Sequence, residues 1–61
     1  MLTEERYVVI TEMVNQRGSI KLTDLCDMLG ISVSTARRDI NALAEMGKIT
    51  KVHGGAVSRL S

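Results

Sequence analysis

Apolar residues recur at helical spacing in three stretches of this chain. The first stretch predicts a helix from Thr3, its N-terminal cap, to Arg17, after which Gly18 favours a stop. The second is the clearest, because four apolar residues fall at i, i+3, i+4 and i+7 just before Gly30. These four residues are Leu22, Leu25, Cys26 and Leu29. The chain therefore begins with two amphipathic helices, joined by residues 19–21 as an extended connection or short edge strand.

A third helix is predicted over residues 33–46, with Gly47 as its stop. Only Gly30 and Ile31 separate the second helix from Ser32, which has the side chain of an N-terminal cap. Two helices joined so tightly are typical of a helix-turn-helix unit. The expected core face of the third helix contains Val33, Ala36, Ile40, Leu43 and Ala44. The opposite face contains Ser34, Thr35, Arg38, Asn41 and Glu45, with Arg37 at the margin.

After the third helix the pattern favours strands. Residues 49–52 are rich in β-branched side chains, Gly54-Gly55 predicts a two-residue hairpin turn, and residues 56–58 can return antiparallel. Ile20 pairing with the edge of this hairpin would supply a third strand. We therefore predict an α+β, mainly α fold: a winged helix-turn-helix with three helices and a small antiparallel β-hairpin wing.

Composition limits the class of protein. The 61 residues make one small domain, and a single aromatic residue, Tyr7, leaves the core to aliphatic side chains. A single cysteine, Cys26, excludes an internal disulfide and a multi-cysteine zinc site, and its place on the apolar stripe suggests a structural role. The sequence has no apolar run long enough to span a membrane and no secretory signal. We expect a cytoplasmic protein with no membrane partner and no cofactor in this domain.

Charge is unevenly distributed along the chain, although its net value is only +1. Residues 1–30 carry three basic and five acidic side chains, a net charge of −2. Residues 31–61 carry five basic and two acidic side chains, a net charge of +3. A domain with this polarity can turn one basic face toward phosphates.

The polar face of the third helix is the first candidate binding site. The major groove of DNA admits one α-helix, in which Arg pairs with guanine and Asn with adenine, while hydroxyls at a helix start bind phosphate or base edges. Arg38 is the better candidate for the groove, and Arg37 for phosphate or a groove edge. A solvated helix face, with Arg38 merely paired to a neighbouring carboxylate, is the alternative. The residues assigned to DNA here are Ser32, Ser34, Thr35, Arg37, Arg38 and Asn41.

The predicted wing supplies the remaining DNA contacts: Lys51, His53, Gly54 and Gly55. A glycine tip lets the backbone approach a phosphate or the minor groove, and nearby cations steer it. An ordinary hairpin, whose glycines serve only the turn, is the alternative. Asp39 projects away from the polar face and is expected to orient an arginine or to tie the third helix to another helix. His53 has no partner spaced for a metal, and no nucleophile has a base, so an enzyme is not expected.

The same segments resemble the N-terminal signature of the DeoR family of bacterial transcriptional regulators. The resemblance covers residues 3–57 and rests on the spacing of Arg6, Ile10 and Val14, on Ser-Val-Ser-Thr-Ala-Arg-Arg-Asp-Ile over residues 32–40, and on Val-His-Gly-Gly-Ala-Val over residues 52–57. Ala36 departs from the pattern, because the family commonly has the larger Ile or Val there. The departure affects packing and leaves the groove face untouched.

The resemblance implies a repressor of carbohydrate or nucleoside metabolism genes that binds double-stranded DNA. It also implies a much larger C-terminal domain that binds a phosphorylated sugar and forms a homo-oligomer. On this basis we expect residues 1–57 to be the DNA-binding domain, excised as a monomer, and residues 58–61 to begin a linker to the absent effector domain.

Two other binding functions remain open at this stage. The same winged fold can serve as a protein–protein interaction module, which would lack the steep salt dependence of duplex binding. RNA binding is less favoured, since the chain lacks the aromatic side chains on which unpaired bases stack.

Overall fold

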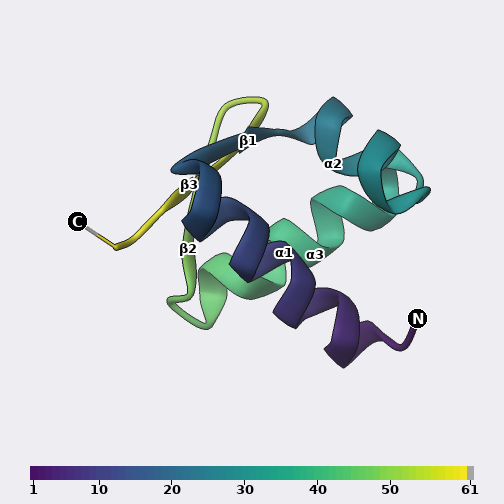
Figure 1. Ribbon diagram of the computed structural model, residues 1–61, viewed down its shortest axis with the longest axis horizontal. Coiled ribbons are helices and arrows are strands. Elements are labelled where there is room, and N and C mark those ends of the chain that lie inside the picture. The colour runs from purple at the N-terminus through teal and green to yellow at the C-terminus, as the bar shows by residue number, and fades with distance from the viewer. Residues whose placement is uncertain (61) are drawn as a thin grey trace.

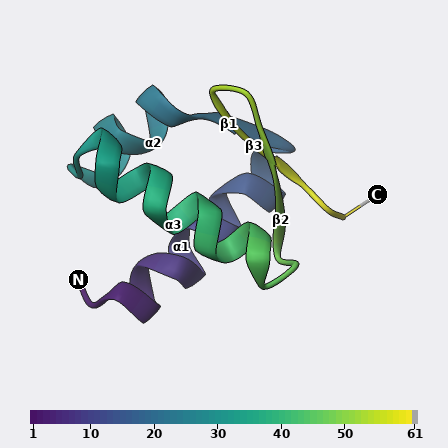
Figure 2. The same cartoon turned by 180° about the vertical axis from the view of Figure 1, so that it is seen from behind.

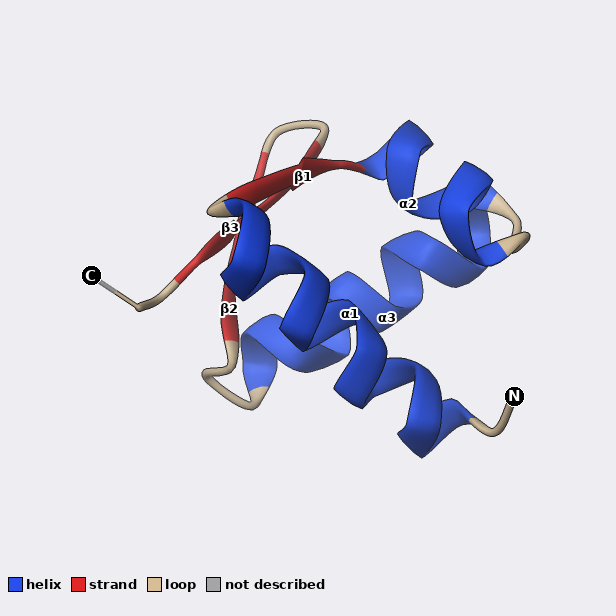
Figure 3. Ribbon diagram, in the orientation of Figure 1, coloured by secondary structure: helices blue, strands red, loops and turns tan. Residues whose placement is uncertain are grey.

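The computed structural model describes residues 1–60 and contains three helices packed against a small sheet. The elements are α1 (Thr3–Arg17), β1 (Ser19–Lys21), α2 (Leu22–Leu29), α3 (Val33–Glu45), β2 (Ile49–Val52) and β3 (Gly55–Ser58). Figure 1 shows α1 in front of α3, and Figure 3 shows the strands gathered on one side of the helices. The predicted winged helix-turn-helix fold is confirmed. No helix within residues 1–60 is long and apolar enough to cross a membrane.

Two predicted helix ends are wrong by one residue. The cap of α1 is Leu2 rather than Thr3, because the Glu5 carboxylate accepts a 2.8 Å hydrogen bond from the Leu2 N–H and draws Thr3 into the first turn. Helix α3 ends at Glu45, since Met46 already forms its C-terminal cap. Gly30, by contrast, ends α2 as expected, in the left-handed conformation at φ 65° and ψ 38°.

The sheet has strand order β1-β3-β2, and both pairings are antiparallel. Ile20 lies opposite Ala56, so the third strand expected from Ile20 is confirmed. Val52 pairs with Gly55, which leaves His53 and Gly54 as the turn. The predicted Gly54-Gly55 turn is therefore wrong.

The two glycines have different structural tasks. Gly54 is exposed and has φ 77°, a conformation that favours glycine. Gly55 is buried inside β3, where a Cβ atom would lie 2.1 Å from the Ile20 carbonyl oxygen. The close approach of β1 explains why glycine stands at this position.

The end of the sheet is fastened to α1. The Ser58 N–H donates to the Gly18 carbonyl, and the Ser58 hydroxyl donates to Oδ1 of Asn15, both at 2.8 Å. These bonds attach the last residue of β3 to the C-terminal end of α1. Ser61, at the end of the expected linker segment, lies outside the described residues.

The core is built from aliphatic side chains of all three helices and of the sheet. Its buried apolar members are Ile10, Val14, Ile20, Leu25, Ala36, Ile40, Leu43, Ile49 and Ala56. On the α2 stripe only Leu25 is fully buried, because the short helix lies at the edge of the core and leaves Cys26 partly covered. Val33 was expected in the core but is 45% exposed, since it occupies the first turn of α3, beyond the end of the packed face.

Candidate nucleic-acid interface

Three hydroxyl groups cluster at the start of α3. Ser32 caps the helix, and its Oγ accepts a 3.2 Å hydrogen bond from the Thr35 N–H. The same oxygen lies 3.0 Å from the Thr35 Oγ1 and 3.2 Å from the Ser34 Oγ. Ser32 and Ser34 are exposed, whereas Thr35 is half-buried. The cluster fixes the first turn and places neutral donors where the helix dipole favours an anion.

The guanidinium and amide groups of α3 project from the next turns. Arg37, Arg38 and Asn41 are exposed, because Ala36 and Ile40 occupy the opposite face and are buried. Figure 2 shows α3 across the front of the molecule, with β2 beside its C-terminal end and α1 behind it. No other described segment crosses in front of α3 in that view, and the exposure of Arg37, Arg38 and Asn41 puts the polar face on the surface.

A hollow separates α3 from the hairpin and brings basic side chains together from both. Lys51 lies on the same face of the sheet as Ala56, its partner in the register, and therefore on the side of the helices. Across the hollow stands Arg37, and His53 lies at the turn. The hollow is lined by Leu22, Arg37, Ile40, Lys51, Val52, His53, Gly54 and Gly55.

The wing tip is held in place by the backbone. The Leu22 N–H, at the start of α2, donates a 2.8 Å hydrogen bond to the Gly54 carbonyl. This bond joins the hairpin turn to the helix-turn-helix unit. Of the two glycines assigned to DNA, Gly54 remains accessible at this tip, whereas Gly55 is covered by β1.

Asp39 is the one buried charged residue among residues 1–60, with 1% of its surface exposed. Its carboxylate accepts two hydrogen bonds from Arg6 of α1: Nε donates to Oδ2, and Nη2 donates to Oδ1 at 3.1 Å. The hydrogen bond to Asp39 raises the pKa of the Arg6 guanidinium above its ordinary value. The expectation that Asp39 ties the third helix to another helix is confirmed.

Arg6 itself was missed as a structural partner in the sequence. It falls four residues before Ile10, on the face of α1 that packs against the core. An arginine on an apolar stripe indicates a carboxylate partner on a neighbouring element, because a buried charge is usually paired. That signal could have directed attention to Asp39.

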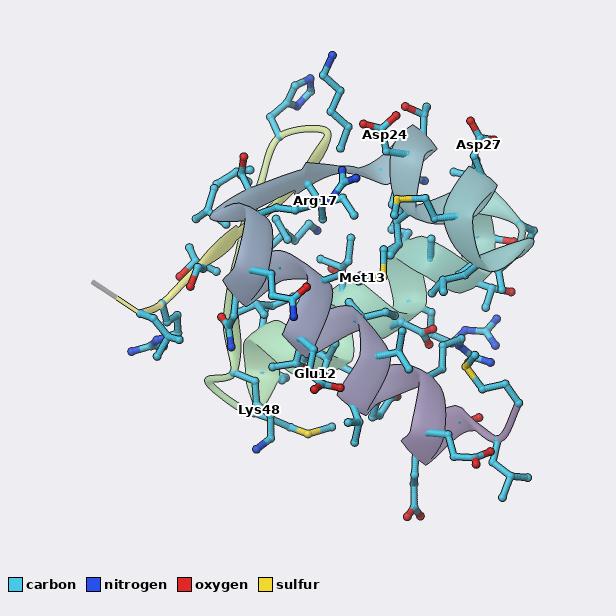
Figure 4. All side chains as sticks on the ribbon, viewed as in Figure 1. Glu12, Met13, Arg17, Asp24, Asp27 and Lys48 are labelled. Carbon is cyan, nitrogen blue, oxygen red and sulfur yellow. The ribbon has the colours of Figure 1, made fainter. Side chains whose placement is uncertain are left out.

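Acidic side chains lie mainly away from the exposed face of α3. Figure 4, seen from the α1 side, shows Glu12 on α1, and Asp24 and Asp27 projecting outward from α2. All three are exposed. Within residues 1–60, no group of three or more histidine, cysteine or acidic side chains is arranged to hold a metal ion.

Sequence comparisons agree with this geometry. A family model described as the DeoR-like helix-turn-helix domain matches residues 6–61. The chain is 43% identical over 58 residues to the lactose phosphotransferase system repressor of Streptococcus mutans. The aligned segment covers 95% of this chain and 23% of that protein. No solved structure gives a significant match.

Two further relatives carry the names of transcriptional regulators. The HTH-type transcriptional regulator UlaR of Shigella flexneri is 45% identical over 56 residues, covering 92% of this chain and 22% of that protein. The uncharacterized HTH-type transcriptional regulator YulB of Bacillus subtilis is 43% identical over 58 residues, and the aligned segment covers 95% of this chain and 22% of that protein. The chain thus spans less than a quarter of the length of these relatives. Its winged fold and its match over nearly all of its length show that the chain belongs to the DeoR family of transcriptional regulators, as a DNA-binding helix-turn-helix domain and not an enzyme.

Proposed function

We propose that this domain binds double-stranded DNA sequence-specifically, with α3 in the major groove and the wing against the adjacent backbone. The observation that carries the proposal is the exposed polar face of α3 beside a hollow with basic side chains on both sides. An α-helix fits the major groove, and cations at its flank bind the phosphates that border the groove.

The geometry favours a division of labour between the two arginines of α3. Arg38 and Asn41 stand on the exposed face with Ser34, so they are proposed to contact base edges. Arg37 lines the hollow with Lys51 and is proposed to bind phosphate with it.

The remaining contacts lie at the two ends of this surface. Ser32 and Thr35 are proposed to bind phosphate at the start of α3, where backbone N–H groups also favour an anion. His53 and the exposed backbone of Gly54 are proposed to meet the backbone at the wing. Gly55 is buried beneath β1 and is not proposed to contact DNA.

Two substitutions separate base reading from phosphate binding. Arg38→Ala should cost about 1–3 kcal/mol of binding and relax specificity at one position of the site. Lys51→Ala should weaken binding to every duplex similarly and reduce the slope of log K against log salt by about one. Fluorescence anisotropy with a duplex selected from a random library, and with random duplex, measures both effects.

Lys48→Ala is the matched control, because Lys48 is exposed but lines a different groove with Tyr7 and Val8. It should leave affinity and salt slope close to those of the wild type. Wild-type affinity for both Arg38→Ala and Lys51→Ala would reject the proposed site. Duplex binding that shows no loss between low and moderate salt would favour a protein-docking module instead.

For the longer protein, we propose a homo-oligomeric, cytoplasmic repressor of carbohydrate or nucleoside metabolism genes, whose additional domain binds a phosphorylated sugar. The names and lengths of the relatives support this proposal, since one is a lactose phosphotransferase system repressor and the matched domain is under a quarter of it. Release of the longer protein from DNA by phosphorylated sugars, with the free sugars as control, tests the effector. Light scattering tests the oligomer.

A further inference from the structure

We infer that Arg6 is a positioning residue for DNA recognition: through Asp39 it sets the orientation of α3 and with it the placement of the side chains proposed to contact DNA. The inference rests on the proposed function. Arg6 belongs to α1, which lies behind α3 in Figure 2, so it would act without touching DNA.

The first argument is directional. Ile10 of α1 and Ile40 and Leu43 of α3 belong to the same buried core of aliphatic side chains. Hydrophobic packing is non-directional and by itself constrains rotation of one helix on another weakly. The fork of two hydrogen bonds from Arg6 to both oxygens of Asp39 joins two planar groups and is geometrically demanding.

The position of Asp39 makes this constraint relevant to the exposed face. Asp39 follows Arg38 directly and stands two residues before Asn41. A rotation of α3 that moves the Asp39 carboxylate therefore moves both proposed base contacts, and base recognition depends on their placement to within about 0.5 Å.

The second argument concerns charge. Asp39 is 1% exposed, and a buried carboxylate without a partner would carry an uncompensated charge that destabilises the packing of α3 against α1. Arg6 occupies both carboxylate oxygens. Among residues 1–60 the Arg6–Asp39 pair is the only ion pair, and neither Arg37 nor Arg38 pairs with a carboxylate of these residues.

The test breaks the fork from either side while keeping the side chains similar in size. Arg6→Lys keeps the positive charge but cannot donate two hydrogen bonds in the fork geometry. Asp39→Asn keeps the shape but replaces one acceptor oxygen by a donor. Arg17→Lys is the matched control, because Arg17 is an exposed arginine on the last turn of the same helix (Figure 4).

The readout is the ratio of affinities for two probes: a duplex selected by the wild-type chain from a random library, and random duplex. Circular dichroism first establishes a temperature at which each variant is folded. We expect Arg6→Lys and Asp39→Asn to lower the ratio about fivefold or more, because this is the discrimination that the loss of one well-placed base contact removes. Arg17→Lys should leave the ratio within about twofold, as expected for a surface exchange. Amide chemical shifts of residues 36–41 should change in Arg6→Lys without DNA present.

Equal loss of affinity for both probes would overturn the inference, because a purely structural defect lowers the folded fraction and scales all binding alike. An unchanged ratio in both fork variants, or unchanged amide shifts along α3, would overturn it as well. Either result would leave the proposed function intact, provided that the wild type prefers the selected duplex. Absence of duplex binding by the wild type would refute the proposed function and the inference together.

Discussion

Replacing Gly55 by alanine tests the packing that places the wing. The added Cβ would lie 2.1 Å from the Ile20 carbonyl oxygen and 3.2 Å from both the Ile20 carbonyl carbon and the Lys21 Cα. All of these atoms belong to the backbone, so no side chain can rotate away. Because Cβ contacts essentially never fall below 3.0 Å, β1 must retreat from β3.

The size of the effect follows from that retreat. A shift of about 1 Å takes β1–β3 hydrogen bonds out of their range of about 2.7–3.2 Å, and each contributes about 0.5–1.5 kcal/mol net. It also loosens Ile20, which is 5% exposed in the core. Together these losses amount to about 2–4 kcal/mol, within or slightly above the usual cost of overpacking. A domain of 61 residues has about 3–9 kcal/mol of stability.

Thermal melting followed by circular dichroism should show a Tm lower by at least about 8 °C for Gly55→Ala. Gly54→Ala is the control: nothing lies within 4 Å of its Cβ position, so its cost, about 1–2 kcal/mol, comes from the positive φ alone. Hydrogen exchange of the Ser58 amide, which donates to Gly18 beyond the far end of β1, should accelerate only in Gly55→Ala. A Tm loss no larger than that of Gly54→Ala would refute the argument.

Two further predictions concern the stability of α3. Leu43→Ala should lower the free energy of unfolding, measured in urea, by about 2–5 kcal/mol because Leu43 is fully buried. Met46→Ala, at a side chain that is 53% exposed, should lower it by less than about 1 kcal/mol. Equal losses would contradict the core assignment. Ser32→Ala should lower the stability of the domain by about 0.5–2 kcal/mol, because the Thr35 N–H loses its capping acceptor. Ser34→Ala should change stability by no more than about 0.5 kcal/mol, and both effects are measured from Tm. A Ser32→Ala variant as stable as the wild type would argue against the cap.

Local signals in the sequence were sufficient for the helices. The stripe ending at Leu29, the left-handed Gly30 and the Ser32 cap each act within a few residues, so their joint pattern located the tight helix-turn-helix connection. The errors at Leu2 and Met46 have the same origin. A helix end depends on which side chain satisfies the free backbone groups, and two neighbouring residues can compete for that position.

The hairpin turn could not be assigned correctly from local sequence. A pair of glycines fits a two-residue turn, and the sequence gives no reason to prefer His53-Gly54. The choice is made by β1, a strand more than 30 residues earlier, whose backbone requires a residue without a side chain opposite Lys21. Pairing across such a separation is a tertiary property.

The binding surface was predictable in its composition but less so in its arrangement. The exposure of Arg38 and Asn41 follows from helical periodicity. The association of Arg37 with Lys51 does not, because it depends on how the hairpin folds back beside α3. The Arg6–Asp39 pair joins positions 33 residues apart, and periodicity could show only that Asp39 points away from the polar face.

The hydrogen bond between the Leu22 N–H and the Gly54 carbonyl bears on the thermodynamics of association. A hairpin that hung free would lose conformational entropy on meeting a ligand, and that loss would weaken binding. Because a hydrogen bond already holds this turn against the start of α2, the turn loses little conformational entropy when α3 and the hairpin bind one target together. We therefore expect the wing to contribute only a small entropic penalty to binding. A variant that lacks the hydrogen bond between Leu22 and Gly54 should show a less favourable entropy of binding in calorimetry.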